Sequence, residues 1–338
     1  MVMRRVKLPF ISGVEIEFVD RGRGLSQVIE WGERGTRFPV VVFGPEGCGK
    51  TSWLKQSIVV LRDLGYDVIY LNPLRRDFLA EIDVRDLGEV VAQIVRDVVL
   101  EHAIARAVWG VISLAREVVR MGRGRLAVLV DDAFQLIGVK ESAFLVKGLL
   151  ELIEHPPASY DRIVAIVATS EGLSRGEIGR HRWAYMRPMW NMSRGAFEEL
   201  YDRIPGPKPD FNAIWTWTGG NPDMLAKLYQ AGWNVERVIV DLANMKGVTA
   251  GFVGRWRAFL DKAIENPDIL WEESVPGELV EELITKNLIV FNVYNRDPWF
   301  WVDEPPPIRD PELGIGEHVA WQTPLHREAI RMVIHKKS

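Results

Sequence analysis

Short apolar runs recur along the first 190 residues of the chain, and amphipathic segments separate them. The runs lie at residues 40–43, 67–71, 126–130 and 162–169, and a fifth candidate lies at 184–190. Strands that are apolar along their whole length are buried on both faces, and helices between such strands form the crossovers of a parallel sheet. The pattern therefore predicts an α/β fold with helices on both faces of a parallel sheet.

Helical periodicity accounts for much of the remaining chain. It predicts helices at residues 52–64 and 143–153, a long helical region over 87–119, and further helices through most of 193–264. A helix at 277–286, a strand at 287–294, a proline-rich excursion, a strand at 318–323 and a helix at 324–334 then follow in winged-helix order. We predict a core domain that holds the sheet at residues 1–192, a helical lid domain at 193–266 and a winged-helix domain at 267–338.

Composition narrows the class of protein. The 338 residues are 47% hydrophobic and 26% charged, as in ordinary globular proteins, and the single cysteine, Cys48, excludes an intramolecular disulfide. We find neither a signal peptide nor a transmembrane stretch, so we expect a cytoplasmic protein with no membrane partner. Residues 268–338 carry 7 basic and 13 acidic side chains, which disfavours a broad electrostatic grip on nucleic acid.

The most specific motif follows the apolar run at residues 40–43. It reads Gly-Pro-Glu-Gly-Cys-Gly-Lys-Thr and matches the phosphate-binding loop of nucleotide-binding proteins, in which backbone N–H groups hold a polyphosphate. Lys50 would reach the β and γ phosphates, and the Thr51 hydroxyl would bind Mg²⁺. We therefore predict that residues 1–192 form a P-loop ATPase core with ATP and Mg²⁺ as cofactors. The predicted binding residues are Gly44, Pro45, Glu46, Gly47, Cys48, Gly49, Lys50, Thr51 and Ser52.

A pair of carboxylates ends the apolar run at residues 126–130. Asp131 would hold Mg²⁺ directly or through water, and Asp132 would polarise the water that attacks ATP; a strand that merely ends in solvated acids is the alternative. Thr169, at the end of the next run, could orient that water or cap the strand. Of the arginines that follow, Arg180 is the candidate to neutralise transition-state charge, in its own site or in a neighbour's.

Several motifs together resemble a known family. Phe18-Val19-Asp20-Arg21, the phosphate loop, Leu-Val-Asp-Asp, a strand ending in Ala-Thr-Ser, the Gly-Gly-x-Pro corner and the terminal winged helix look like the archaeal ATPases of the STAND branch of P-loop NTPases. These ATPases are relatives of the AAA+ initiator proteins. The resemblance extends over nearly the whole chain, and the order of the motifs is more specific than any one of them.

The resemblance implies roles for individual residues. Gly44, Gly49, Lys50 and Thr51 would bind phosphates and Mg²⁺, and Asp131 with Asp132 would form the Walker B pair. The segment of Phe18 and Arg21 and the corner of Pro222 would flank the adenine. The second Walker B acid is often glutamate in related ATPases, so the shorter Asp132 puts the hydrolysis rate in question.

The leading hypothesis is a slow ATPase that acts as a conformational switch. ATP or ADP would set the position of the winged helix, which is a candidate site for a protein partner, in a monomer or a nucleotide-dependent oligomer. The alternative is an ATP-dependent DNA-binding protein related to replication initiators. Against duplex DNA, the candidate recognition helix carries Glu278, Glu281 and Glu282 beside one Lys286. A small-molecule kinase fits the loop but leaves the lid and winged helix unexplained.

Overall fold

The computed structural model describes residues 4–81, 87–100, 104–121, 124–170, 176, 178–179 and 181–336. They form two compact units, and the boundary between them falls inside the phosphate loop. The first, the core unit, comprises Met1–Val6, Gly22–Phe43 and Lys50–Arg187. The second unit comprises Lys7–Arg21, Gly44–Gly49 and Pro188–Ser338.

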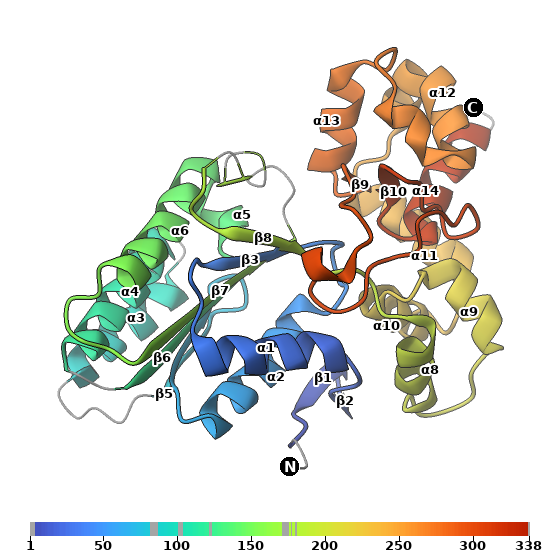
Figure 1. Cartoon of the computed structure of the whole chain (residues 1–338). Coiled ribbons are helices and arrows are strands. Elements are labelled where there is room, and N and C mark those ends of the chain that lie inside the picture. Colours follow the sequence, from blue (N-terminus) through green and yellow to red (C-terminus); the bar gives the residue numbers. More distant parts are fainter. Residues whose placement is uncertain are drawn as a thin grey trace. The chain divides into compact units, whose positions relative to one another are not determined.

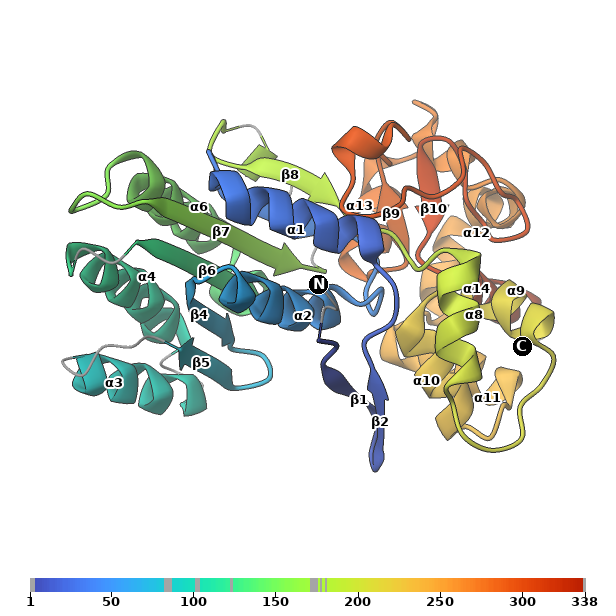
Figure 2. The ribbon, with the colours of Figure 1, turned by 60° about the horizontal axis from the view of Figure 1, so that its bottom comes forward.

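A six-stranded sheet forms the centre of the core unit, with the strand order β5-β4-β6-β7-β3-β8 (Figures 1 and 2). Strands β4, β6, β7 and β3 are parallel to their neighbours in this series, while β5 runs antiparallel to β4 at the edge. The sheet confirms the predicted α/β fold. Its strands are β3 (Val40–Phe43), β4 (Asp67–Asn72), β5 (Asp77–Glu81), β6 (Arg125–Asp131), β7 (Arg162–Thr169) and β8 (Tyr185–Pro188).

The parallel register brings the polar ends of the strands to one edge of the sheet. Phe43, the residue before the phosphate loop, pairs with Thr169 of β7. Asp131 of β6 pairs with Ala168 of β7, so the two strands end level with each other. This is the edge at which α/β sheets bind ligands, because the carboxyl ends of their parallel strands meet there.

Helices cover both faces of this sheet, as Figures 1 and 2 show. The helices are α1 (Gly22–Arg34) and α2 (Lys50–Asp63) on one face, and α3 (Gly88–Val99), α4 (Ile104–Arg120), α5 (Phe134–Ile137) and α6 (Val139–Glu154) on the other. Alternate strand residues such as Val128 and Val167 join the buried apolar cluster beneath α4 and α6. Burial on both faces explains why the strands lack polar positions.

Four elements of the N-terminal part were not predicted. β5 lacks an apolar run, and its side chains are only half-buried, so it carries a weak strand pattern at the sheet edge. Helix α1 contains Gly22, Gly24 and Gly32, which lower its helix propensity, although Val28 is fully buried. The hairpin of β1 (Lys7–Ile11) and β2 (Val14–Glu17) is short and mostly exposed.

The second unit is mainly helical after its hairpin. Its helices are α8 (Arg194–Asp202), α9 (Phe211–Thr218), α10 (Pro222–Gln230), α11 (Val235–Met245), α12 (Ala250–Glu265), α13 (Gly277–Thr285) and α14 (Pro324–His335), with short 3₁₀ helices η3 (Pro267–Trp271) and η4 (Pro298–Phe300). Side-chain oxygens of the residues before most of the α-helices accept a backbone N–H of the first turn, which defines where each helix begins. These capping residues are Ser193, Asp210, Asn221, Asn234, Thr249 and Thr323.

Strands β9 (Ile289–Phe291) and β10 (Val319–Trp321) form an antiparallel pair between α13 and α14. The elements thus follow the predicted order of helix, strand, wing, strand and helix. We call residues 292–318 the wing segment. Arg296 holds it by donating hydrogen bonds to the carbonyls of Tyr294 (2.7 Å) and Gly316 (2.9 Å). The Asp268 carboxylate accepts backbone N–H groups at its other end, including that of His318 at 2.8 Å.

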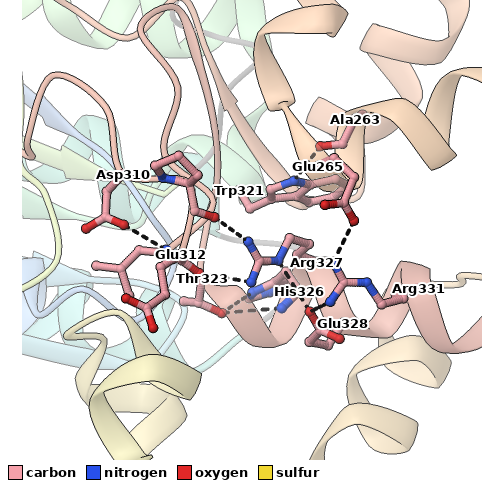
Figure 3. A network of polar contacts seen from close by, with 12 residues as sticks. Ala263, Glu265, Asp310, Glu312, Trp321, Thr323, His326, Arg327, Glu328 and Arg331 are labelled. Atoms are coloured by element: carbon pink, nitrogen blue, oxygen red, sulfur yellow. Dashed lines mark hydrogen bonds and ion pairs between the residues drawn. The ribbon is translucent and has the colours of Figure 1, made fainter. Parts of the chain in front are cut away.

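Helix α14 is fastened to the wing segment by its first turns (Figure 3). Arg327 donates hydrogen bonds to the carbonyls of Pro311 (2.8 Å) and Glu312 (2.9 Å). Arg331, one turn later, pairs with Glu265 of α12 at 3.1 Å. These contacts join the last helix to the wing and to α12 within the second unit. Among the described residues, no helix is both long and apolar enough to cross a membrane.

Phe197 lies at the centre of the apolar core of the second unit. It is fully buried, and its ring contacts Trp215 at a centroid distance of 5.8 Å and Phe211 at 6.3 Å. We expect Phe197→Ala to lower the free energy of unfolding of this unit by about 3–5 kcal/mol, because it removes buried apolar area and leaves a cavity. Urea denaturation would measure the loss. The control Phe144→Ala changes a residue that is 56% exposed and should alter stability by less than about 0.5 kcal/mol. Equal losses in the two variants would contradict the placement of Phe197 in the core.

Candidate nucleotide-binding site

The first part of the phosphate loop, Gly44–Gly49, has a backbone that only glycine permits at two positions. Gly44 has φ 154°, and a Cβ there would lie 1.9 Å from the carbonyl oxygen of Met189. Gly47 has φ 75°, and its Cβ would lie 2.3 Å from the Cβ of Asp223. The glycines of the motif therefore allow a close approach of the loop to residues of the second unit.

Three successive carbonyls of the loop accept hydrogen bonds from groups of the second unit. The side-chain amide of Asn221 donates to Glu46 O at 2.9 Å. The backbone N–H of Asp223 donates to Gly47 O at 3.3 Å. Arg21 Nη2 donates to Cys48 O at 2.6 Å. The Gly-Gly-x-Pro corner, which sequence analysis linked to adenine, thus contacts the loop backbone.

Arg21 is almost completely buried, with 3% of the residue exposed. Besides Cys48 O, its guanidinium donates to the carbonyl of Trp190 (2.9 Å) and to Asp303 Oδ2 (2.9 Å). Its ion-pair partner Asp303 is also buried. Phe18 lies buried three residues earlier. The adenine contacts expected of Phe18 and Arg21 stay a prediction.

A chain of amides links the corner before α10 to the start of α14. The Asn221 amide group donates to Asn191 Oδ1 (2.8 Å), and the Asn191 amide group donates to the carbonyl of Gln322 (3.0 Å). Gln322 Oε1 in turn accepts the backbone N–H of Glu46 at 2.8 Å. The Glu46 side chain pairs with Lys246, the residue that follows α11. Pro222 occupies the first turn of α10, where it needs no N–H partner.

The second part of the loop belongs to the core unit. Lys50 and Thr51 begin α2, and the Lys50 residue is 6% exposed. Ser52 follows in the same first turn and is half-buried. A helix N-terminus presents free N–H groups and partial positive charge, which favours an anion such as a phosphate.

Asp131, at the end of β6, is a buried carboxylate in which only one oxygen accepts hydrogen bonds from the described residues. Its Oδ2 accepts hydrogen bonds from Asn72 Nδ2 (2.8 Å) and Tyr70 Oη (3.1 Å). The Thr51 hydroxyl also interacts with this carboxylate. Oδ1 is buried and has no hydrogen-bond partner among the described residues. A free, buried carboxylate oxygen beside a threonine hydroxyl fits the ligands expected for Mg²⁺, which takes few protein ligands when phosphates supply the rest.

The environment of Asp131 disfavours its negative charge. Burial, followed by repulsion from Asp132, raises the pKa of Asp131 to about 6, against the lowering effect of its hydrogen bonds to Thr51, Asn72 and Tyr70. Burial also raises the pKa of Tyr70, so its phenol stays a donor. A divalent cation at Oδ1 would relieve this penalty, because it favours the ionised carboxylate.

Asp132 faces a small polar network at the same sheet edge. Its backbone has φ 49°, and its N–H donates to Ala168 O at 2.9 Å. Ser170 Oγ lies 3.5 Å from Asp132 Oδ1 and accepts a hydrogen bond from Gln135 Nε2 at 2.8 Å. Thr169 is buried at the end of β7. The strand register thus gathers Asp131, Asp132 and Thr169, as their positions in the sequence indicated.

The structure describes only some of the arginines that follow β7, among which a transition-state arginine was expected. Arg175 and Arg180 lie outside the described residues. Arg187 is described: its guanidinium lies 6.0 Å from the centre of the Tyr185 ring, and burial lowers its pKa. No arginine is therefore assigned as a catalytic finger from these contacts.

Several residues of the site had no motif to reveal them. Asn72 is the last residue of the buried strand β4, at the edge of the sheet where Asp131 lies. This position at a strand end was the only feature of the sequence that could have indicated a role for Asn72. Tyr70 looked like any buried strand residue. Asn191, Asp303 and Gln322 are far from the loop in sequence, so only the fold shows that they contact the loop or its partners.

A glycine-rich turn between a buried strand and a helix, with a buried acid at the end of another parallel strand of the same sheet, defines a P-loop nucleotide-binding protein. Residues 18–228 match the model of the family described as the ATPase domain predominantly from Archaea. The chain belongs to this family of Walker-type P-loop ATPases. No curated protein sequence matches it.

Several solved structures match the chain at low sequence identity. A Walker-type ATPase of Pyrococcus abyssi is 12% identical, with 93% of this chain and 96% of that chain covered and a TM-score of 0.48. AMPPCP-bound DnaA from Aquifex aeolicus is 16% identical over 79% of this chain and 84% of that chain, with a TM-score of 0.40. Cdc6p from Pyrobaculum aerophilum is 15% identical over 97% and 98%, with a TM-score of 0.37.

The raised pKa of Asp131 predicts a pH-dependent stability. Its pKa of about 6 in the folded protein exceeds the ordinary aspartate value of 3.8, so the native state binds this proton more tightly and loses stability as pH rises through that interval. Asparagine does not ionise, so Asp131→Asn should abolish this pH-dependent loss of stability. The variant should therefore be more stable than the metal-free wild type at about pH 7.5, by up to about 3 kcal/mol. At about pH 4 the two proteins should differ little. Thermal unfolding in a chelator across pH would measure this, and a pH-independent difference would contradict it.

Proposed function

We propose that this protein is a Mg²⁺-dependent ATPase that hydrolyses ATP slowly and uses the bound nucleotide as a conformational switch. Its membership of a family of Walker-type P-loop ATPases supports the ATPase part of the proposal. The observation that carries the proposal is the buried Asp131, whose Oδ1 has no hydrogen-bond partner among the described residues. Such a carboxylate is costly unless a cation compensates it.

Each site residue has a chemical role in this proposal. The N–H groups at Gly47 and Gly49 and the Lys50 ammonium bind the phosphates. Thr51 and Asp131 hold Mg²⁺, which neutralises charge on the phosphate oxygens. Cys48 takes part through its backbone, and the thiol has no role.

Asp132 is the proposed group that polarises the attacking water. Ser170, 3.5 Å away, and Gln135 behind it restrict how this carboxylate can turn. Thr169 is the proposed residue that orients the water or senses the γ-phosphate. Aspartate is one methylene shorter than glutamate, so its carboxylate reaches less far toward a water. This shorter reach is the physical reason for expecting slow turnover.

In the switch, ATP and ADP favour different positions of the winged-helix domain at residues 267–338, with the helices of 193–266 as the lid. A ligand shifts such an equilibrium only by its difference in affinity for the two states. Arg180 is the candidate that neutralises transition-state charge, in cis in a monomer or in trans in a nucleotide-dependent oligomer. A protein is the proposed partner of the winged helix.

Duplex DNA is the alternative partner, and the charges on α13 argue against it. Arg255 of α12 pairs with Glu278 (2.5 Å) and Glu282 (3.5 Å) of α13. Among the ion pairs of the described residues, Arg255 is the only cation on this acidic face, and both glutamates already neutralise it. A helix that enters the major groove presents free basic and amide groups to phosphates and bases. We therefore propose a protein rather than duplex DNA as the partner.

Two variants separate binding from hydrolysis. Lys50→Ala should weaken binding of a fluorescent ATP analogue at least about tenfold, because it removes a direct phosphate contact. Asp132→Asn should keep the affinity but lower phosphate release about 100-fold or more, because only the water activation is lost. Particle mass measured with trapped ATP would distinguish a monomer from an oligomer. Lys140→Ala, an exposed lysine of α6, is the control; ATP turnover unchanged in Lys50→Ala would refute the proposal.

A mobility-shift titration at two salt concentrations tests the DNA alternative. We expect weak duplex binding, in the micromolar range or above, whether or not ATP is present. Tight binding that falls steeply with salt and is lost when positive charge on the second unit is removed would favour the DNA reading instead, because phosphate contacts release counterions.

A further inference from the structure

The contacts of the phosphate loop fix the direction of its N–H groups. In a trans peptide the carbonyl of one residue and the N–H of the next point to opposite sides. The carbonyls of Glu46 and Cys48 are held by Asn221 and Arg21 at 2.9 and 2.6 Å. The N–H groups of Gly47 and Gly49 must therefore point away from these partners, toward the side on which a phosphate can bind.

Arg21 is the charged member of this support, and it depends on the wing segment. Its guanidinium is buried, so it needs a compensating negative charge. Asp303 supplies that charge at 2.9 Å, and Trp190 O accepts a further hydrogen bond at 2.9 Å. Arg21 thus connects the wing segment to the phosphate loop, because the same guanidinium contacts Asp303 and Cys48 O.

The backbone at both ends of this ion pair is unusual. Arg21 has φ 58° and Asp303 has φ 65°, values that residues other than glycine seldom adopt. Such conformations persist where the surrounding contacts impose them, and they are common at ligand sites.

We propose that Arg21 and Asp303 are positioning residues for nucleotide binding. Asp303 of the wing segment orients the Arg21 guanidinium, which holds the Cys48 carbonyl so that the Gly49 N–H faces the phosphates. The inference rests on the proposed function, because it assumes that the loop binds a nucleotide. It extends that function by placing one determinant of phosphate affinity in the C-terminal wing, 282 residues from Arg21.

The coupling must be reciprocal. If the contact between Asp303 and Arg21 strengthens nucleotide binding, bound nucleotide strengthens that contact by the same factor. The wing segment should consequently become more protected from hydrogen exchange when ADP binds. The contacts from Asp303 to Arg21 and from Arg21 to Cys48 O would thus connect the phosphate site of the proposed switch to the C-terminal part of the chain.

Equilibrium binding of a fluorescent ADP in the presence of Mg²⁺ tests the inference with the full-length protein. Asp303→Ala should weaken the affinity about tenfold or more, because the buried arginine loses its charge-assisted partner. Asp303→Asn keeps one oxygen as acceptor and should lose less, and it guards against a folding failure of the alanine variant. Arg21→Lys should also weaken binding, since lysine cannot reach three acceptors with a planar fork. Glu304→Gln, at the exposed neighbour, is the matched control.

Hydrogen exchange of peptides covering residues 295–305 is the second readout. ADP should slow exchange there in wild type and in Glu304→Gln, but not in Asp303→Ala. Unchanged ADP affinity in folded Asp303 and Arg21 variants would overturn the inference, even if their wing segments exchange faster. Failure of the wild type to bind nucleotide in a manner that depends on Lys50 would instead refute the proposed function, so the two failures can be told apart.

Discussion

The structure of the candidate site depends on how the loop carbonyls are satisfied. A glycine-rich turn has no regular hydrogen-bond pattern of its own, and buried backbone groups without partners are costly. Here a side-chain amide, a backbone N–H and a buried guanidinium hold three successive carbonyls. Because the carbonyl and the N–H of one trans peptide point to opposite sides, the N–H groups of Gly47 and Gly49 face away from Asn221 and Arg21. The contacts of the carbonyls thus set the direction of these two N–H groups.

Each unit buries a charged side chain close to the phosphate-loop sequence or the sheet edge, and the environments of these two charges differ. Arg21 has a buried carboxylate partner, Asp303, so its charge is compensated within the second unit. Asp131 of the core unit has only neutral hydrogen-bond donors and a second acid beside it, and its pKa is raised to about 6. The first arrangement is complete without a ligand. The second becomes favourable when a cation is added, which is the behaviour expected of a metal ligand.

The sequence was informative wherever chemistry is encoded in consecutive residues. The motif from Gly44 to Thr51 needs its glycines at fixed spacing, and Asp131 and Asp132 directly follow a buried strand, so both could be located without a fold. The lone Asn72 and Tyr70 could not, because an amide or phenol at a strand end has many ordinary roles. Strand β5 was missed because an edge strand is buried on fewer sides and carries a weaker apolar pattern.

By itself, the sequence determined the family, the parallel sheet and the edge at which its polar ends meet, because strand periodicity and short motifs act locally. Only the tertiary structure decided that Asp303 and Gln322 support the phosphate loop. Both are more than 270 residues from their partners, at separations of 282 and 276 residues. A buried ion pair or amide bond depends on distance and burial in space, and a single sequence carries no signal for either over such separations.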